Sequence, residues 1–447
     1  MSLEVLSLKT KEFLDEVSKQ IKYKPANKLI TEELEAHIED IKNDNLCKGY
    51  SEKEAEEKAV EQMGDAIQIG RRLNKIHRPQ LDWKLVILIS ILIGFGILNS
   101  NLQPGYYLVG TTHIGTKIGI LIGALLGIGI YFLDYRKIKK QSNFIYLIAT
   151  TFVIIPKVYL MLTLAEMNTR LWNIAIPLYI IAFAGYIANY NKNKDFIKIL
   201  ALSITSFILL LIVSESITNA GIMVLAYIGI ATAKIVKENK KFAKKLAILY
   251  LGTFIITTLL TTIMINIPYL LSFNSELHYQ EYGYIMDAKT NEVLQNVKWV
   301  GEAETPQITE NRILNSNSSQ FTFIYLLGKI GVLPCLLLIL AIILTSIKLV
   351  KSSKDIDEAY GKYLIIGLST LYMIQSIVNI LMNVNIGIRT DVNLPFVSNG
   401  TIYVLINILS FAIILSVYRR KNINFEELGD EQTNENKSDF NIIKSLY

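Results

Sequence analysis

Three amide side chains recur at every fourth position of an otherwise apolar stretch in the C-terminal third of the chain. Gln375, Asn379 and Asn383 share one face of a helix at this spacing. An amide among apolar groups needs hydrogen-bond partners, so this face is predicted to point into a helix bundle or a wet cavity. The amides then either bind a polar ligand or form a hydrogen-bond ladder between helices, and the sequence leaves both interpretations open.

The residues that follow these amides predict a second part of the same site. Residues 394–400 read Leu-Pro-Phe-Val-Ser-Asn-Gly, and the proline and glycine favour irregular backbone. At a membrane edge such backbone is tolerated where it lines a cavity. We therefore predict that Pro395 and Ser398 lie beside the amides; a plain tight turn is the alternative.

A lysine inside another apolar stretch is a further candidate. Lys157 directly follows Pro156, and an ionisable residue at membrane depth is a functional candidate. Its long side chain can instead reach the head groups from the outer third of a span. Lys157 thus either snorkels to the membrane surface or binds the pyrophosphate of an anionic lipid.

The composition indicates a membrane protein. Of 447 residues, 51% are hydrophobic and 19% charged, with a net charge of +6; soluble domains carry about 25% charged residues. This composition argues against a soluble enzyme, a nucleic-acid binder and a secreted disulfide scaffold. The four histidines have no metal-ligand spacing, so the residues alone predict no metal site.

Ten apolar stretches are long enough to cross a bilayer, and helices are the expected form because lipid leaves the backbone no other partners. The predicted fold is therefore an all-α polytopic bundle of about ten transmembrane helices. Their approximate cores are 85–101, 114–133, 144–163, 172–190, 197–214, 217–235, 246–267, 322–347, 363–385 and 400–417.

Loop charge predicts the orientation. With the N-terminus in the cytoplasm, the inner loops hold 20 Lys and Arg residues and the outer loops 5. This bias follows the positive-inside rule and places both termini in the cytoplasm. Three domains follow: a cytoplasmic three-helix domain over 1–80, a membrane domain over 81–421 with a large external loop at 268–321, and a polar cytoplasmic tail over 422–447.

Two local patterns refine this picture. Ser51 and Glu54 form a capping-box pattern before one helix of the first domain, Thr31 is a plausible N-cap, and Gly64 breaks or bends a helix. Glycines every fourth residue from 115 to 127 permit close helix approach. They indicate packing against a neighbouring span or, alternatively, homodimerisation.

The amide face and the Leu-Pro-Phe-x-Ser segment resemble the shape, elongation, division and sporulation family, the FtsW/RodA/SpoVE group of bacterial membrane proteins. The family reads approximately Q-x-x-x-N-I-x-M-x-x-G and then G-x-x-L-P-F-x-S-Y-G-G. The resemblance covers about residues 85–420, while residues 1–80 resemble a permease-prefix helical domain. The matching residues are Gln375, Asn379, Ile380, Met382, Leu394, Pro395, Phe396, Ser398 and Gly400.

The resemblance implies a function. Family members of the bacterial cytoplasmic membrane polymerise lipid II, a lipid-linked peptidoglycan precursor, in cell division or cell shape, with a penicillin-binding protein as partner. It also implies a divalent metal cofactor. Trp172, with Arg170, lies near the position of the family's N-G-x-x-R-W and is therefore a substrate-binding candidate.

One departure from the family falls on its catalytic acid. The Asp of H-T-D-F-I-F aligns with Gln320, whereas Phe321, Phe323 and Gly331 fit the family pattern. A carboxylate there would take the proton from the attacking sugar hydroxyl. An amide cannot, and losing a general base costs about 10²–10⁴-fold in rate.

We therefore expect a divergent peptidoglycan glycosyltransferase with impaired catalysis, a pseudoenzyme candidate. Another loop acid, Glu310 or Asp287, is an alternative base. Two other function classes stay open: a non-catalytic protein that binds a lipid-linked precursor or a division partner, and a lipid or solute transporter.

Overall fold

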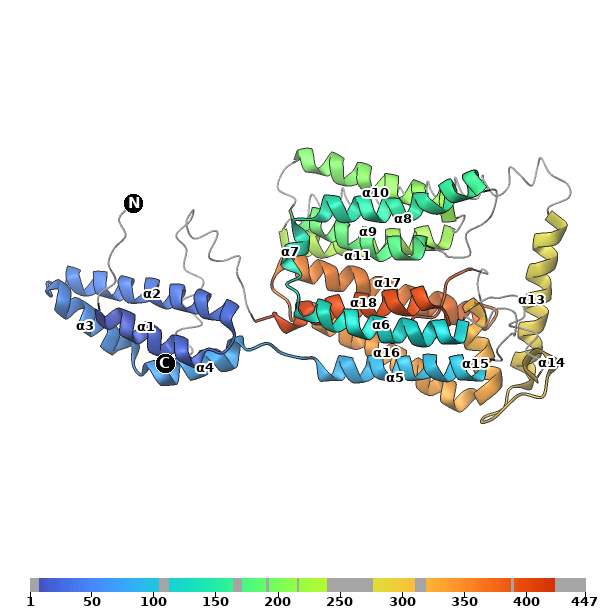
Figure 1. The fold of residues 1–447 in the computed structure, drawn as a ribbon, viewed down its shortest axis with the longest axis horizontal. Helices are drawn as coiled ribbons and strands as arrows, with labels where there is room; N and C mark the ends of the chain where they lie inside the picture. The colour runs from blue at the N-terminus through green and yellow to red at the C-terminus, as the bar shows by residue number, and fades with distance from the viewer. Residues whose placement is uncertain are drawn as a thin grey trace. The chain divides into compact units, whose positions relative to one another are not determined.

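The computed structural model describes residues 8–103, 112–163, 171–189, 193–214, 217–238, 276–309, 319–386 and 390–422, and over these residues the chain forms helices and loops without strands (Figure 1). The chain divides into two units. One comprises Met1–Leu81 together with Arg419–Tyr447, and the other comprises Asp82–Tyr418. The C-terminal segment thus groups with the N-terminal residues.

The described residues of the first unit form four helices, where the sequence analysis expected three. They are α1 (Leu8–Gln20), α2 (Lys24–Cys47), α3 (Glu52–Met63) and α4 (Ala66–His77). The capping box of Ser51 and Glu54 is present at α3. Gly64, at φ +86°, ends α3, and Asp65 caps a separate helix α4. The N-cap prediction for Thr31 was wrong, because α2 begins seven residues earlier, at Lys24.

The second unit is a polytopic helical membrane domain. Five of its described helices, α5, α6, α16, α17 and α18, are long and apolar enough to cross a membrane. The predicted span at 246–267 lies outside the described residues. The elements are α5 (Trp83–Leu102), α6 (Thr112–Phe132), α7 (Arg136–Lys139), α8 (Ser142–Thr163), α9 (Trp172–Ala188), α10 (Asn193–Ser214), α11 (Ile217–Glu238), α13 (Glu276–Asn296), α14 (Pro306–Thr309), η1 (Ser319–Phe321), α15 (Thr322–Ile330), α16 (Val332–Lys354), α17 (Ala359–Asn383) and α18 (Thr401–Arg419).

One predicted span is divided into two helices. The continuous helix expected over 322–347 was wrong, because Gly331 separates α15 from α16. Gly331 has φ +93°, and a Cβ there would lie 2.8 Å from the carbonyl oxygen of Trp299. Only glycine fits this conformation and this close approach.

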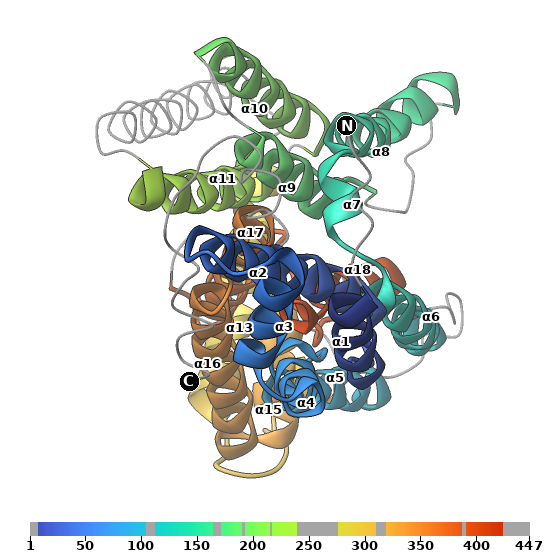
Figure 2. The same cartoon turned by 90° about the vertical axis from the view of Figure 1, so that its left-hand side faces the viewer.

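Helix α17 lies at the centre of the membrane unit. Figure 2 shows α8, α9, α10 and α11 on one side of it and α5, α6, α16 and α18 on the other. Gly367 permits this position, because a Cβ there would lie 2.6 Å from Cγ2 of Ile180 in α9 and 2.7 Å from Cδ1 of Ile230 in α11. Side chains of α17 therefore face the protein interior on several sides.

The glycine stripe of α6 packs against α18. A Cβ on Gly119 would lie 2.6 Å from the carbonyl oxygen of Thr401, and one on Gly123 would lie 2.9 Å from Cδ1 of Ile408. This contact confirms the packing interpretation of the stripe.

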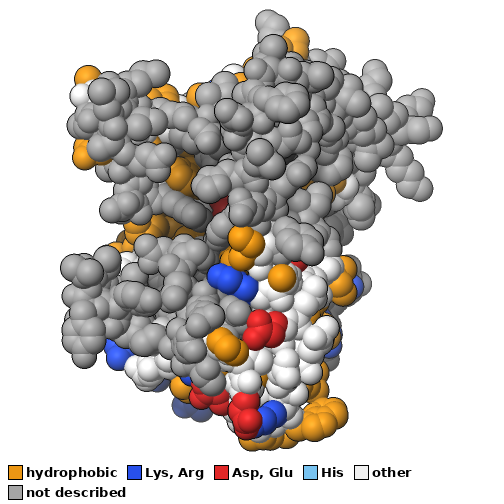
Figure 3. Space-filling model, turned by 90° about the vertical axis from the view of Figure 1, so that its right-hand side faces the viewer, with side chains coloured by type: hydrophobic (Ala, Val, Ile, Leu, Met, Phe, Trp, Pro, Cys, Tyr) orange, Lys and Arg blue, Asp and Glu red, His pale blue; other side chains and the backbone are white. Residues whose placement is uncertain are grey.

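Part of the predicted external loop forms helices. It contains α13, α14 and η1, and ion pairs join it internally and to α15: Lys298 to Glu304 at 2.5 Å and Lys329 to Glu302 at 2.6 Å. Figure 3 shows that the described part of the face at this end carries both acidic and basic side chains. This surface has the mixed charge of a solvated segment.

Candidate functional site

The amides of α17 point into the protein. The carboxylate of Glu358 caps the helix by accepting from the backbone N–H of Tyr360 at 3.0 Å. Twenty residues further along, Asn379 and Asn383 are both 0% exposed. A buried amide is stable only with its hydrogen bonds made, so their partners define what this face does.

Asn379 and Asn383 together clamp the backbone of residue 320. The carbonyl oxygen of Gln320 accepts from Nδ2 of Asn379 and from Nδ2 of Asn383, both at 2.9 Å. Asn379 also donates to the carbonyl of Val392 at 2.8 Å. Oδ1 of Asn383 accepts from the N–H of Ile324 at 3.1 Å, which satisfies a donor in the first turn of α15. The ladder interpretation therefore accounts for both asparagines.

The side chain of Gln320 behaves differently from its backbone. It is half-buried, and Oε1 is a buried atom with no hydrogen-bond partner among the described residues. A buried acceptor without a donor costs about 1–3 kcal/mol. A ligand that brings a donor to this oxygen would recover that cost.

The segment after α17 forms a tight turn held by its own serine. Oγ of Ser398 accepts from the N–H of Leu394 at 2.9 Å, and the carbonyl of Leu394 accepts from the N–H of Ser398 at 3.0 Å. Phe396 has φ +65°, an unusual conformation for an aromatic residue. Its ring packs edge-on against Phe411 with centroids 5.0 Å apart, and this packing offsets part of the strain.

Helix α5 supports this turn from its other side. Nδ2 of Asn99 donates to the carbonyl of Val397 at 3.0 Å. Gly96 lies so close to the carbonyl of Phe396 that no side chain fits between them. Pro395 and Ser398 are thus buried parts of a fixed turn.

The turn brings a carboxylate and another amide toward residue 320. Oδ1 of Asn393 accepts from Oγ of Ser319 at 2.8 Å, while its Nδ2 is buried with no partner in the described part of the chain. Two residues before it, Asp391 accepts from Nδ2 of Asn219 at 3.2 and 3.1 Å through its two oxygens. Asn379 bonds both residue 320 and residue 392, so Asp391 is adjacent in sequence to a residue held at the clamp.

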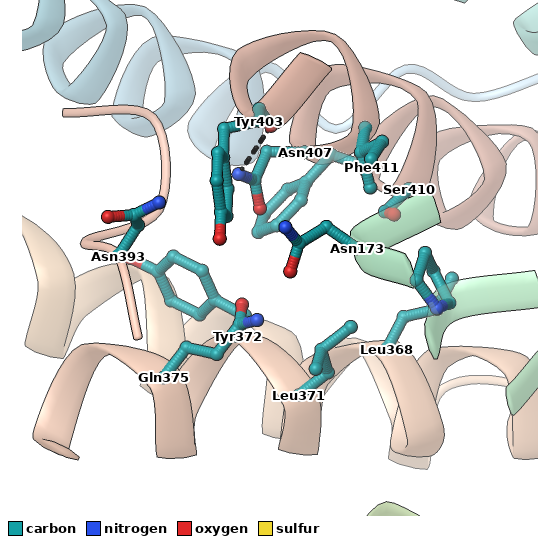
Figure 4. A pocket seen from close by; sticks show the side chains of 12 residues that line it. Asn173, Leu368, Leu371, Tyr372, Gln375, Asn393, Tyr403, Asn407, Ser410 and Phe411 are labelled. Carbon is teal, nitrogen blue, oxygen red and sulfur yellow. Dashed lines mark hydrogen bonds between the residues drawn. The ribbon is translucent and has the colours of Figure 1, made fainter. Parts of the chain in front are cut away.

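A small cavity lined by both polar and apolar side chains adjoins these residues. It lies between α9, α17 and α18, and Figure 4 shows its side chains converging on a common space. Its water-accessible volume is about 20 Å³, roughly the room that one water needs. Its polar lining is neutral: Asn173, Tyr372, Gln375, Asn393, Tyr403, Asn407 and Ser410.

This lining indicates which groups the cavity suits. Amides and hydroxyls both donate and accept, so they match a water molecule, which is also what the volume of the cavity admits. None of the described lining residues carries a charge to neutralise a phosphate. Gln375 is therefore the member of the amide face that borders an open space.

The divalent metal that the resemblance implies would need a set of ligands on this chain. A divalent cation needs several oxygen ligands, usually including carboxylates. Among the described residues no three His, Cys, Asp or Glu side chains form a group that could hold a metal ion. The metal cofactor stays a prediction of the resemblance.

The remaining predicted residues either form no hydrogen bond of the clamp or lie outside the residues that the structure describes. Lys157 belongs to α8, but its side chain is not described; Glu310 is likewise outside. Trp172 begins α9 beside the cavity residue Asn173, and its Nε1 is buried without a partner among the described residues. The carbonyl of Asp287 accepts from Nδ2 of Asn385 at 3.1 Å.

Several residues of the site were missed by the sequence analysis. Asn99, Asn219 and Asn407 lie in apolar helices, as the predicted amides do, so their presence at membrane depth was a usable signal. Asp391 and Asn393 had no such signal, because both lie in a loop.

No family model and no curated relative matches this sequence. Its structure is similar to a chain of a peptidoglycan synthase complex solved to describe the coordination of polymerization and crosslinking, with a TM-score of 0.58 and 14% identity over 77% of this chain and 99% of that one. It is also similar to the rod shape determining protein RodA of Thermus thermophilus, with a TM-score of 0.53 and 14% identity over 77% of this chain and 98% of that one. A mutant of that RodA gives a TM-score of 0.52 at 13% identity. The chain therefore has the RodA fold, which confirms the helical membrane fold that the sequence resemblance implied.

Proposed function

We propose that this chain is a cell-envelope membrane protein of cell-wall synthesis that binds a lipid-linked peptidoglycan precursor and transfers its sugar poorly or not at all. The RodA fold supports the assignment to cell-wall synthesis. The proposal of impaired chemistry rests on Gln320. Asn379 and Asn383 clamp its backbone, and the sequence resemblance aligns it with the family's catalytic acid.

The residues of the site give a reason for the proposed loss of transferase activity. A transferase must remove a proton from the attacking hydroxyl, and the amide of Gln320 has no basic lone pair to accept it. The turn that holds Ser398 and the clamp that holds residue 320 are both intact. Binding geometry can therefore persist where proton transfer fails.

The test is polymerisation of lipid II by the purified protein beside a Gln320→Asp variant. We expect the variant to make glycan strands at a rate about 10²–10⁴-fold above the wild type. If both proteins made glycan strands at equal, measurable rates, the proposed impairment of catalysis would be refuted. No product from either, with lipid II binding intact, would leave the non-catalytic binder as the function.

Asp391 is the alternative source of a base. It replaces a glycine of the family pattern, and Asn219 donates to both of its oxygens. An Asp391→Asn variant keeps the shape and removes the carboxylate. If wild-type protein polymerises lipid II and this variant does not, then Asp391 has taken over the acid's role and the impairment proposal fails.

The resemblance and the similar chain also support a partner. That chain belongs to a peptidoglycan synthase complex, and we propose that this protein pairs with a penicillin-binding protein. We also propose that both termini of this protein lie in the cytoplasm. Co-purification with the penicillin-binding proteins of the source cell, detected with a labelled β-lactam, tests the pairing. Absence of any labelled band in a crosslinked, purified sample would remove it.

A further inference from the structure

A second pocket lies at the end of the bundle where α7 meets α8, α9 and α10. Its volume is about 140 Å³, well above the roughly 10–15 Å³ that a single water needs. Lys139 and Lys140 line it from α7 and the turn after it, and Lys198 lines it from α10. Segments distant in sequence thus bring three ammonium groups to one hollow.

The charged residues in the described lining of the pocket are lysines. None of its described lining residues is acidic, and the other polar groups are Ser142, Asn143, Tyr186 and Asn189. An anion in this hollow would be attracted by the positive charge of the lysine side chains that line it. The side-chain amides of Asn143 and Asn189 beside them can donate to the anion's oxygens.

Two contacts restrain the side chain of Lys198 beside the pocket. Its Nζ lies 3.5 Å from Oδ1 of Asn143 and 5.6 Å from the centre of the Tyr186 ring. A cation over an aromatic face is stabilised and restrained. Tyr186 OH also donates to the carbonyl of Ser142 at 3.3 Å, which joins α9 to the first residue of α8.

The surface beside the pocket is apolar. Phe144 and Leu147 on α8 are 59% and 61% exposed, and Ile197, next to Lys198 on α10, is 70% exposed. Figure 2 shows α8 and α10 at the periphery of the membrane unit. Tyr146 joins the two helices by donating to the carbonyl of Leu202 at 3.0 Å. A basic hollow bordered by greasy, outward-facing side chains suits an amphiphile better than a free ion.

We propose that this pocket binds the phosphate head group of an anionic phospholipid whose acyl chains lie along the exposed faces of α8 and α10. The loop charges predict that this end of the bundle faces the cytoplasm. Basic pockets between spans on that side are suited to anionic head groups. The site is separate from the clamp at residue 320, so it does not depend on the proposed enzymatic role.

Native mass spectrometry of the full-length protein in neutral detergent tests the site. The probes are dioctanoyl phosphatidylglycerol, dioctanoyl phosphatidylcholine and inorganic phosphate. We expect phosphatidylglycerol to bind at least tenfold more tightly than phosphatidylcholine, and a Lys139→Gln, Lys140→Gln, Lys198→Gln triple variant to lose at least tenfold in that affinity. Equal binding of both lipids to the wild type would overturn the proposal.

The matched control removes three lysines from the same end of the unit. Lys351 and Lys354 end α16 and Lys362 lies in the first turn of α17, so their change to Gln gives the same net charge. The control should change phosphatidylglycerol affinity less than twofold. An equal loss in both triple variants would show a general charge effect and refute the pocket.

Two further arms keep the result decisive. Displacement of phosphatidylglycerol by millimolar inorganic phosphate would assign the pocket to a soluble phosphate and overturn the lipid. If the triple variant does not fold, the single Lys198→Gln variant replaces it, and unchanged affinity in that variant would contradict the proposal.

Discussion

The clamp on residue 320 predicts a departure from additivity in a double-mutant cycle. The carbonyl of Gln320 has two donors, Asn379 and Asn383. Asn379→Ala or Asn383→Ala alone leaves that carbonyl with one donor, whereas the double variant leaves it with neither. The double variant should therefore lose more stability than the two single variants together.

The magnitudes follow from the contacts. Asn379→Ala strips the carbonyl of Val392 of the Asn379 donor, and Asn383→Ala removes the acceptor of the Ile324 N–H. Each buried group left unpaired costs about 1–3 kcal/mol. The double variant adds a similar cost at residue 320. One opposing effect is the direct 3.3 Å contact from Nδ2 of Asn383 to Oδ1 of Asn379, which both single variants already remove.

The cost of leaving the carbonyl of Gln320 unpaired should exceed the opposing effect of the contact between Asn383 and Asn379. Hydrogen bonds between membrane helices contribute about 0.6 kcal/mol on average, less than the cost of a bare buried carbonyl. We expect a coupling of about 0.5–2 kcal/mol in the direction of extra loss. The free energy of unfolding can be measured by SDS titration in mixed micelles, followed by helical circular dichroism.

The control cycle pairs Asn99→Ala with Asn383→Ala. Asn99 donates to the carbonyl of Val397, and the two asparagines share no acceptor. Their effects should add within about 0.5 kcal/mol. If the Asn379 and Asn383 cycle is also additive, or its coupling has the opposite sign, the shared clamp is not what stabilises this region.

Three other predictions test separate parts of the chain. Gly119→Ala should destabilise the protein by about 1–3 kcal/mol by overpacking α6 against α18, while Gly129→Ala, with open space around it, should not; SDS titration compares them. Cys47 is exposed and Cys335 buried, so an impermeant maleimide should label Cys47 in inverted vesicles and not in intact cells; the reverse pattern would overturn the orientation. Burial lowers the pKa of His77 below its usual 6.5, against an opposing hydrogen bond to the carbonyl of Asn422. The unfolded chain therefore binds more protons, and stability is complete above about pH 6.5 and falls below it. Hydrogen exchange of α4 in the full-length protein should rise from pH 7 to about pH 5.5 relative to a His77→Gln variant; a matching rise in that variant would refute the role of His77.

The length of the apolar stretches was enough to predict most of the membrane helices. Long apolar stretches such as 85–101 and 400–417 correspond to α5 and α18 because lipid leaves an apolar backbone few alternatives to helix. The break at Gly331 was missed, although Lys329 followed by Gly331 is a pattern that ends helices. The positive φ of Gly331 and the packed carbonyl of Trp299 show why glycine is required there.

The site was harder to predict than the fold. Spacing placed Asn379 and Asn383 on one face and therefore indicated that they are buried, but spacing cannot say what a buried amide bonds. Their acceptor, the carbonyl of Gln320, is about 60 residues away in sequence. Asp391 and Asn393 reach the same region through a loop, whose path no periodic pattern encodes.

The clamp explains why the chemistry at residue 320 can change while the fold persists. Asn379 and Asn383 bind the carbonyl oxygen of residue 320, and every residue type supplies that atom. The side chain at 320 is thus free of the interaction that fixes its backbone, and its Oε1 makes no hydrogen bond to another described residue. Replacing the amide by a carboxylate should leave the clamp intact, so Gln320→Asp is expected to keep the wild-type free energy of unfolding within about 1 kcal/mol. A change in glycan synthesis by that variant would then report the exchange of the amide for a carboxylate on a side chain one methylene shorter; a collapse of the fold would show instead that the amide itself stabilises the site.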